Sequence, residues 1–406
     1  MSKRTLLFSA VAMALLAGTP ALRAADAPKA SFEWDLRARS EMVGDDGFAR
    51  DADATTARLR AGLRLAPAAG WTVLLEGEGV AGFGNYNSGA NGKTQYPLVM
   101  DPTGAELNQV WVGWKNAQGG VTVGRQRILL DNQRWVGNVG WRQNEQTFDA
   151  VAAQWKPVKD LTLSYYWLDK VHRAAGDKAL NRLARERRLD THLVNVAWKR
   201  GRQQWAGYAY LHDDRDVASA SSATYGLRWT GAVAADGQGF GWSAEYARQT
   251  DHARNPARFS VNYWLLEPTW TQGKTTFRAG WEHLGSNGVV ALQTPLATLH
   301  AFNGWDDQFL TTPAKGMEDR YLGVGGKFGS GKAAGKLNWA VSWHDYRADV
   351  GSLHYGSEWN ASLGFPLPGG LNGMLKVADY RADRFSRDNT KLWLQVEWKG
   401  NRALAQ

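Results

Sequence analysis

SFEWDLRARSEM, residues Ser31–Met42, is the stretch that decides the fold. Apolar and charged residues alternate along it, with Phe32, Trp34, Leu36 and Ala38 set between Glu33, Asp35, Arg37 and Arg39. Successive side chains of a β-strand point to opposite faces, so a period of two predicts a strand. One face of that strand should meet an apolar medium and the other face water.

The same alternation recurs along the chain, for example in Thr56–Pro67 and Thr390–Lys399. Eighteen segments of this kind can be counted, and the connections between them fall into two alternating classes. Short, turn-like ones such as PAAG (67–70) and PLPGG (366–370) alternate with generally longer polar ones, including residues 82–104, 124–146, 170–190 and 285–317. An even strand number with short turns on one rim is the layout of outer-membrane proteins. We therefore predict an all-β fold, a transmembrane antiparallel up-and-down β-barrel of 18 strands with short periplasmic turns and long extracellular or inserted loops.

The tryptophans support this layout. The 406-residue chain contains 21 Trp, no Cys and a formal net charge of +9. Many of the tryptophans lie within a few residues of a short turn or of the C-terminus: Trp71, Trp114, Trp155, Trp198, Trp205, Trp229, Trp242, Trp270, Trp339 and Trp398. Tryptophan favours the membrane–water interface, so these positions predict a periplasmic aromatic girdle. A soluble sheet protein with tryptophan in its core fits less well, because the second face of each strand is charged.

The N-terminus has the pattern of a secretory signal peptide over residues 1–24. Lys3 and Arg4 precede an apolar run from Leu6 to Ala17, and small residues follow near Ala24. No later apolar run approaches the roughly 18 residues of a spanning helix. We expect residues 25–406 to form a single β-barrel domain in the outer membrane of a Gram-negative cell.

One loop differs from an ordinary surface connection. GRQRILLDNQRWVGNVGWRQNEQTFD, residues Gly124–Asp149, combines Arg125, Arg127, Arg134 and Arg142 with large apolar residues such as Trp135 and Trp141. A loop of this length that is rich in apolar side chains indicates a packed feature. We predict that it folds into the lumen of the barrel and helps to select what passes.

The predicted inner face is rich in arginine. Alternation places Arg37, Arg39, Arg58, Arg60, Arg64, Arg228 and Arg278 there. Guanidinium groups bind carboxylates through a planar fork, and rings of basic residues select anions in pores. In the alternative interpretation these arginines form a structural ladder with Glu33, Asp35, Glu76, Glu78, Glu245, Glu282 and Glu358. Both interpretations can hold if only some arginines are paired.

Three segments resemble the alginate-export family of proteobacterial outer-membrane barrels: LNQVWVGW (Leu107–Trp114), residues 124–150, and QTPLATLHAFNGWDDQFLTTPAKGMEDRYLGVGGKF (Gln293–Phe328). The resemblance implies an 18-stranded barrel, an electropositive constriction and passage of solutes or anionic polysaccharide. It also implies that Arg125, Arg127, Asp131, Arg134 and Arg142 line the pore. Chains of the family usually end on an aromatic residue, whereas Lys399–Gln406 extends beyond Trp398 here.

The remaining motifs give weaker signals. DKALNRLARERRL, residues Asp177–Leu189, predicts a short basic helix in an external loop, either solvated or facing lipopolysaccharide phosphates. Residues 293–315 could form a gate, an aromatic contact surface or an ordered cap. The histidines show no metal-ligand spacing and no nucleophile motif is present, so we predict neither an enzyme nor a cofactor.

The sequence thus predicts a monomeric outer-membrane channel that conducts hydrophilic, preferably anionic solutes such as sugar acids or oligosaccharides. The alternatives are a dedicated alginate or exopolysaccharide export porin that works with a periplasmic secretion complex and, with less support, a barrel enzyme acting on lipid. The expected partners are outer-membrane lipid, lipopolysaccharide and the anionic solute or polysaccharide. Nucleic acid is not expected, because the basic residues alternate along strands of an exported chain.

Overall fold

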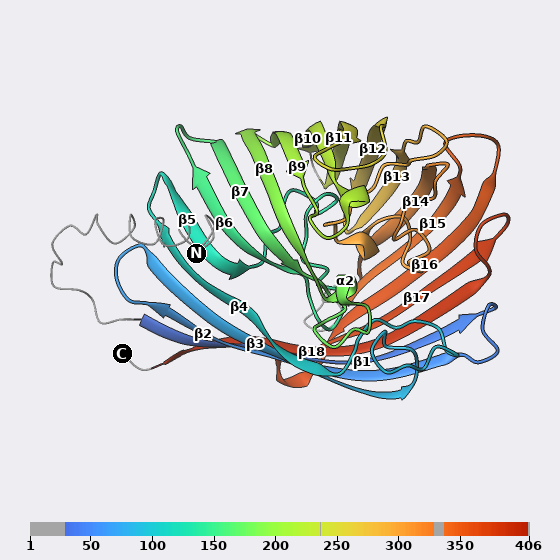
Figure 1. The fold of residues 1–406 in the computed structure, drawn as a ribbon, viewed down its shortest axis with the longest axis horizontal. Coiled ribbons are helices and arrows are strands. Elements are labelled where there is room, and N and C mark those ends of the chain that lie inside the picture. The colour runs from blue at the N-terminus through green and yellow to red at the C-terminus, as the bar shows by residue number, and fades with distance from the viewer. Residues whose placement is uncertain (1–28, 236, 329–336, 405–406) are drawn as a thin grey trace.

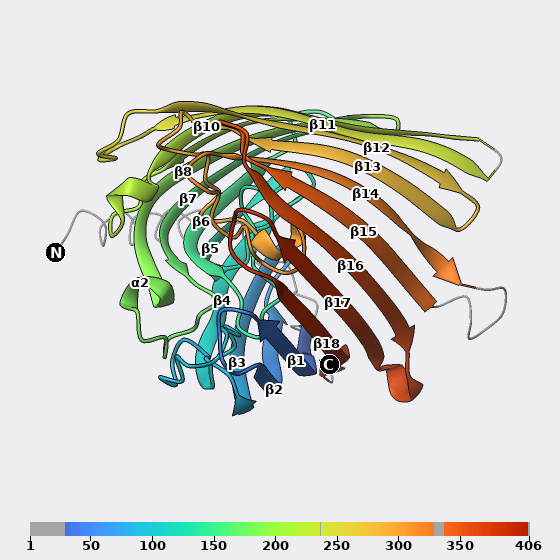
Figure 2. The same ribbon diagram turned by 90° about the vertical axis from the view of Figure 1, so that its right-hand side faces the viewer.

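A computed structural model describes residues 29–235, 237–328 and 337–404 of the chain. The described residues form one large barrel with two loops folded into its interior (Figures 1 and 2). The predicted signal peptide, residues 1–24, lies outside the described residues.

The strands are β1 (Lys29–Asp45), β2 (Ala52–Ala66), β3 (Trp71–Asn85), β4 (Gly104–Lys115), β5 (Gly119–Gln126), β6 (Thr147–Trp155), β7 (Leu161–His172), β8 (Glu186–Arg200), β9 (Gln203–His212), β10 (Ser222–Ala235), β11 (Gln238–Asp251), β12 (Ser260–Gln272), β13 (Thr275–Leu284), β14 (Met317–Phe328), β15 (Leu337–Arg347), β16 (His354–Pro366), β17 (Asn372–Ala382) and β18 (Asn389–Leu404). Short helical turns are α2 (Arg182–Arg185), η1 (Ala218–Ala220), η2 (Leu299–Ala301) and η4 (Pro368–Gly370).

The strands close into a ring. Within the described residues there is one 18-stranded sheet, in which each strand pairs antiparallel with its neighbours in the chain. β1 pairs with both β2 and β18, so the sheet has no free edge. A membrane-spanning sheet needs this closure, because lipid offers no partner for edge N–H and C=O groups. The predicted fold class is confirmed.

The connections alternate as predicted. Short turns such as 67–70, 116–118 and 201–202 lie at one rim, which we call the short-turn rim. Residues 86–103, 127–146, 173–185 and 285–316 are long loops that start from the opposite, long-loop rim. The loops at 127–146 and 285–316 turn back into the barrel, and we call them the first and second inserted loops (Figure 1).

The outward face of the sheet is apolar and unpacked. Phe32, Leu63 and Leu75 form one continuous cross-strand row, and each is at least 36% exposed. Directly paired residues share a face of a sheet, so the row lies on the outer wall. Side chains of this kind exposed on strand after strand indicate a wall that faces lipid.

Aromatic side chains bound this wall at both ends. At the short-turn rim Trp198 stacks on Trp205 and Trp229 contacts Trp242, with ring centroids 5.0 and 5.1 Å apart. A second row, which sequence reasoning did not identify, lies nearer the long-loop rim and includes Trp264 and the paired Trp343 and Trp359. Beyond the second row the outward positions become charged: Arg320 pairs in register with Asp345.

Two local predictions need correction or completion. The helix expected over Asp177–Leu189 is only α2, Arg182–Arg185, because Glu186 already begins β8 and pairs with His172 of β7. The segment after Trp398 continues β18 as far as Leu404, in register with β1. No helix of the described residues is long and apolar enough to cross a membrane.

Candidate functional site

The inner wall of β1 and β2 carries the arginines that alternation predicted, and each of them has a partner. Arg58 is completely buried, with Asp35 at 2.5 Å and Glu397 at 3.6 Å from its Nη2. Arg64, six residues along, is 38% exposed and pairs with Glu33. Of these two arginines, the one deeper in the barrel is fully matched by carboxylates, whereas the one nearer the short-turn rim is accessible to water.

Several of these arginines hold the first inserted loop in place. Arg37 Nη1 donates to the carbonyl oxygens of Gly140 and Trp141 at 3.1 Å, and Arg39 Nη2 donates to the Trp141 carbonyl at 2.6 Å. Arg60 forms an ion pair with Glu78 and donates to the Gln143 carbonyl. Guanidinium groups have enough donors to pair with a carboxylate and bind a loop backbone at the same time. The alternative of a structural ladder therefore applies to this part of the wall.

The charged residues of the first inserted loop are also paired. Arg127 contacts Glu76 at 2.8 Å and Glu145, Arg134 contacts Glu282 at 2.9 Å, and Arg142 contacts Glu41 at 3.2 Å and Asp307 at 2.9 Å. Burial opposes the charge of Arg142, but Glu41, Asp101 and Asp307 together raise its pKa above the usual value. Ion pairs therefore join the loop to the wall at Glu41, Glu76 and Glu282 and to the second inserted loop at Asp307.

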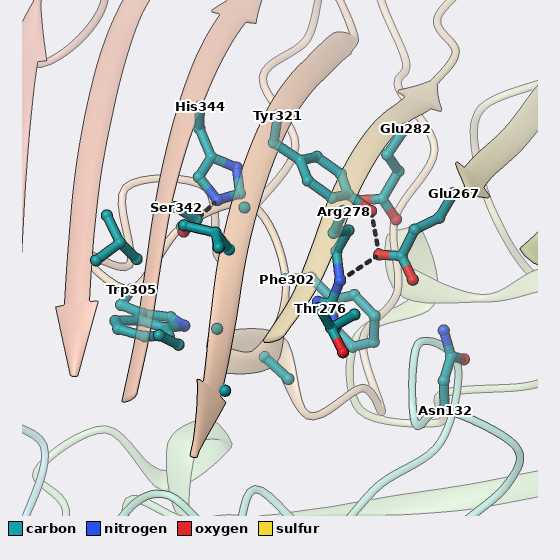
Figure 3. Close-up of a pocket in the computed structure, with 18 of the residues that line it drawn as sticks. Asn132, Glu267, Thr276, Arg278, Glu282, Phe302, Trp305, Tyr321, Ser342 and His344 are labelled. Carbon is teal, nitrogen blue, oxygen red and sulfur yellow. Dashed lines mark hydrogen bonds and ion pairs between the residues drawn. The ribbon is translucent and has the colours of Figure 1, made fainter. Parts of the chain in front are cut away.

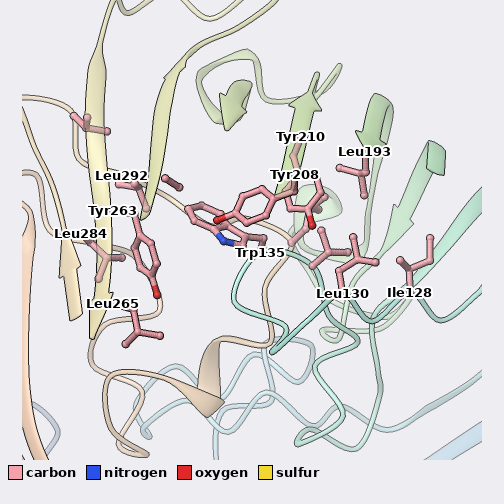
Figure 4. Packing of buried hydrophobic residues seen from close by; sticks show 14 of the residues in the cluster. Ile128, Leu130, Trp135, Leu193, Tyr208, Tyr210, Tyr263, Leu265, Leu284 and Leu292 are labelled. Atoms are coloured by element: carbon pink, nitrogen blue, oxygen red, sulfur yellow. The ribbon is translucent and has the colours of Figure 1, made fainter. Parts of the chain in front are cut away.

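Apolar packing fixes the same loop on the opposite side of the barrel. Trp135 lies between Tyr208 and Tyr263, with ring centroids 5.9 and 5.2 Å away, and its Nε1–H donates to Glu245 at 2.7 Å (Figure 4). Ile128 and Leu130 are buried in the same cluster. This explains why a long polar loop contains large apolar residues: it forms a core inside the barrel.

The second inserted loop contacts the first directly. Thr298 Oγ1 donates to Gln133 Oε1 at 2.8 Å, and Gln146 Nε2 donates to the Leu296 carbonyl at 2.9 Å. Arg134 Nη2 donates to Asn303 Oδ1 at 3.0 Å. The second inserted loop, which contains residues 293–315, therefore packs against the first loop inside the barrel.

A buried lysine joins both inserted loops to the wall. Lys376 of β17 places its Nζ 4.0 Å from the Trp141 ring centroid and 3.9 Å from that of Trp305, and donates to His300 Nε2 at 2.7 Å. The other ring nitrogen of His300, Nδ1, donates to Asp307 at 2.7 Å. Aromatic faces attract a desolvated cation. Trp393 of β18, the residue that breaks the apolar alternation of its strand, points inward and completes this cage.

Two hollows open toward the short-turn rim. Hollow A has a volume of about 860 Å³ and lies between the second inserted loop and β12–β15. Its lining mixes both signs of charge: Arg278 and the Tyr321 hydroxyl converge on Glu267, at 3.5 and 2.7 Å, while Glu282 lies nearby (Figure 3). Arg228, paired with Glu245, also lines hollow A.

Hollow B has a volume of about 510 Å³ and lies below the first inserted loop, against β4–β7. Its ionic lining consists of Arg64, Lys115, Arg127 and Lys156, with no carboxylate among the described lining residues. Trp111 and Tyr166 supply aromatic surface, and Leu129 of the loop is 51% exposed there. Lys115, Lys156 and Trp111 were missed by sequence reasoning because they stand next to turns or within ordinary alternation.

The structure brings together most of the predicted pore-lining set but separates one member. Asp131 is inside and accepts a hydrogen bond from Asn195 at 2.8 Å, and its burial raises its pKa. Arg125 pairs in register with Val110, which is 40% exposed on the outer wall, so its side chain shares that outer face. It contacts Asp149 at 2.9 Å. Two residues later, Arg127 lies inside, because β5 ends at Gln126.

Comparisons with known proteins agree with this geometry. A family model described as alginate export matches residues 29–276. Among solved structures, Pseudomonas aeruginosa OpdK superposes with a TM-score of 0.72 at 13% identity, covering 92% of this chain and 99% of that one. Pseudomonas aeruginosa OpdQ gives 0.71 at 14%, covering 94% and 100%. OccK5 (OpdH) of the same organism gives 0.69 at 13%, covering 93% and 99%. No curated protein sequence matches the chain.

Proposed function

The chain belongs to the alginate-export family, and on that premise we propose that it is a monomeric outer-membrane channel that conducts hydrophilic solutes with a preference for anions such as sugar acids or oligosaccharides. A closed barrel with an apolar outer wall, aromatic rows at both ends and a polar interior supports the placement in a membrane. It also gives the protein its partners, outer-membrane lipid and lipopolysaccharide.

One observation carries the anion preference. In the ion pairs whose arginine itself lines one of the two hollows (Arg64, Arg127, Arg228 and Arg278), the arginine is more exposed to water than its carboxylate. The exposed fractions are 38% for Arg64 against 28% for Glu33, and 54% for Arg278 against 20% for Glu267. Arg127 is 31% exposed, whereas its partners Glu76 and Glu145 are 8% and 0% exposed. The charge that these ion pairs present to the two hollows is therefore mainly cationic.

The transport mechanism follows from this arrangement. The exposed guanidinium groups attract an anion into the short-turn end of the lumen and replace part of its hydration. Several weak sites in succession allow the anion to leave again, as conduction requires. The inserted loops narrow the passage that the anion must take.

A reversal-potential measurement under a KCl gradient in planar bilayers tests the proposal. We expect chloride preference in the unmodified channel and a weaker preference in the Arg64→Gln/Arg278→Gln variant, because each substitution leaves an acidic partner in the lumen. One charge about 8 Å from the ion's path in water is worth about 0.5 kcal/mol, or roughly two-fold in permeability ratio. Arg125→Gln, on the outer face, is the matched control and should leave the ratio unchanged. Cation preference in the unmodified channel would refute the proposal.

The family match favours a second candidate, a dedicated exporter of alginate or another anionic exopolysaccharide that works with a periplasmic complex. The two functions differ in what a deletion strain loses. An exporter deletion should stop polymer secretion, whereas deletion of a solute channel should slow growth on the anion that it takes up.

A further inference from the structure

Hollow B differs from hollow A in having cations without carboxylates in its lining. Hollow A is lined by four cationic residues, Arg228, Lys274, Arg278 and Lys327, together with three acidic ones, Glu267, Glu282 and Asp319. The described lining of hollow B has two arginines and two lysines and no acidic residue. Both hollows open at the same rim, but the described lining of hollow B has the larger excess of positive charge.

Each arginine of hollow B already forms an ion pair with a carboxylate that does not line the hollow. Arg64 pairs with Glu33, and Arg127 pairs with Glu76 and Glu145. The lysines are different: among the described residues, neither the Lys115 nor the Lys156 side chain forms a hydrogen bond or an ion pair. Both are exposed. The hollow therefore presents two uncompensated positive charges, and a ligand with two negative charges would neutralise them.

The apolar part of the lining indicates what carries those charges. Trp111 points inward from β4, and the Arg64 guanidinium lies 5.5 Å from its ring centroid. Leu129 is half exposed beside it, whereas its neighbours Ile128 and Leu130 are buried. An indole and a leucine that face water offer a contact for the flat face of a ring. The volume of about 510 Å³ suits a small molecule.

We propose that hollow B is a binding site for a small dianion carried on a ring, with its two negative charges set against Lys115 and Lys156 and its ring against Trp111 and Leu129. This inference rests on the proposed channel function and names the ligand class of one site within it. A cyclic dicarboxylate and a phosphorylated sugar share this chemistry, and the experiment separates them.

The test is current block in planar bilayers containing the full chain at low salt, where screening is weak. Phthalate and benzoate share a ring and differ by one carboxylate, whereas succinate has two carboxylates and no ring. We expect phthalate to block at a concentration about five-fold below that of benzoate, since each added charge near two lysines gives a factor of a few. Phthalate should also block the current at a lower concentration than succinate does.

The variant Lys115→Gln/Lys156→Gln should reduce the phthalate-to-benzoate difference to less than two-fold. Neither lysine side chain has a partner to lose, so the barrel should fold normally. The matched control is Lys178→Gln/Arg182→Gln at the long-loop rim, where both side chains are more than 60% exposed, and it should keep the difference. Trp111→Leu should weaken phthalate block more than succinate block.

An unchanged phthalate-to-benzoate ratio in the lysine variant would overturn the site, as would equal block by phthalate and benzoate in the unmodified channel. Equal block by succinate and phthalate would overturn the ring contact. Glucose 6-phosphate blocking more strongly than phthalate would assign the site to phosphate esters, and the reverse order would assign it to dicarboxylates. If hollow B does not bind dianions, the chloride preference in KCl should still be observed. A cation preference in KCl would instead contradict the proposed channel function, so the two outcomes are distinguishable.

Discussion

At the residue scale, Arg58 and Arg64 show that the position of an arginine along the barrel axis determines whether its charge is paired or exposed to the lumen. Both are on the inner face of β2, yet Arg58 is completely buried between two carboxylates and Arg64 is 38% exposed beside hollow B. Arginine remains protonated when buried, so Arg58 needs its partners close by. Arg64 is partly exposed to water, so its positive charge can still attract a solute. The same residue type is therefore fully paired within the wall at one position and exposed to the lumen at another, where we propose that it attracts the solute.

His300 gives a pH prediction at the same scale. Burial lowers its pKa to about 3, and Lys376 and Arg142 act in the same direction, although Asp307 opposes them. The hydrogen bonds fit a neutral ring, because Nδ1 donates to Asp307 while Nε2 accepts from the Lys376 ammonium. We therefore interpret the contact of His300 with Asp307 as a hydrogen bond of the neutral imidazole at pH 7.

A folded-state pKa below that of free histidine, about 6.5, gives a stabilisation that is complete above pH 6.5 and is lost as the pH falls toward 3. Between pH 7 and pH 5 the loss is about 2 kcal/mol for opening of the second inserted loop. Hydrogen exchange of residues 296–309 should therefore accelerate at pH 5, after correction for the intrinsic rate. His300→Gln should abolish this pH dependence. An equal acceleration in that variant would contradict the assignment.

At the scale of elements, the inserted loops behave as packed elements. Trp135 is the anchor of the first loop: it fills the space between Tyr208 and Tyr263 and satisfies Glu245. Truncation of a buried aromatic costs about 3–5 kcal/mol. Because the strands keep their own ladder of hydrogen bonds, this cost should fall on the loop and leave the barrel closed.

Trp135→Ala should therefore give larger or noisier single-channel currents with an intact barrel, seen as unchanged heat-modifiable migration on a gel. Trp155→Ala is the control, since Trp155 is a 56% exposed aromatic on the outer wall near a short turn. A loss of the folded barrel in Trp135→Ala, or quiet currents of unchanged size, would show that the loop is not held by this contact.

At the scale of the whole molecule, the outer wall is an apolar band between two aromatic rows. The loss of folding free energy on introducing a charged side chain depends on its depth in that band. For arginine it is about 2–4 kcal/mol at the middle of the membrane and about 0–1 kcal/mol near the interface. Leu59 and Leu65 are on the same strand and the same outward face, at 49% and 36% exposure, and differ in distance from the short-turn rim.

Leu59→Arg should destabilise the barrel by about 2–4 kcal/mol in denaturant unfolding from lipid vesicles, whereas Leu65→Arg should cost about 1 kcal/mol or less. Neither substitution removes an inner-wall contact, so the difference isolates depth in the membrane. Equal costs at the two positions would mean that the band does not face lipid as we infer.

The sequence by itself determined the strand number, the closure of the barrel and the identity of its two faces. An alternation of period two indicates which medium each face of the strand contacts, and this information is local. The facing direction of Leu36, Arg37, Ala38 and Arg39 can be predicted without reference to any other segment. The long apolar-rich loop likewise revealed that it must be packed, because Trp135 and Trp141 had to be buried somewhere.

Only the tertiary structure decided which charges are available in the lumen. Whether an arginine is matched depends on residues far along the chain, as with Arg37 and Glu397 or Arg142 and Asp307. Arg125 and Arg127 look equivalent in sequence, yet the end of β5 turns one outward and the other inward. Pairing and exposure are set by long-range register and loop packing, which a local period cannot encode, so the candidate site appears only when the barrel has closed.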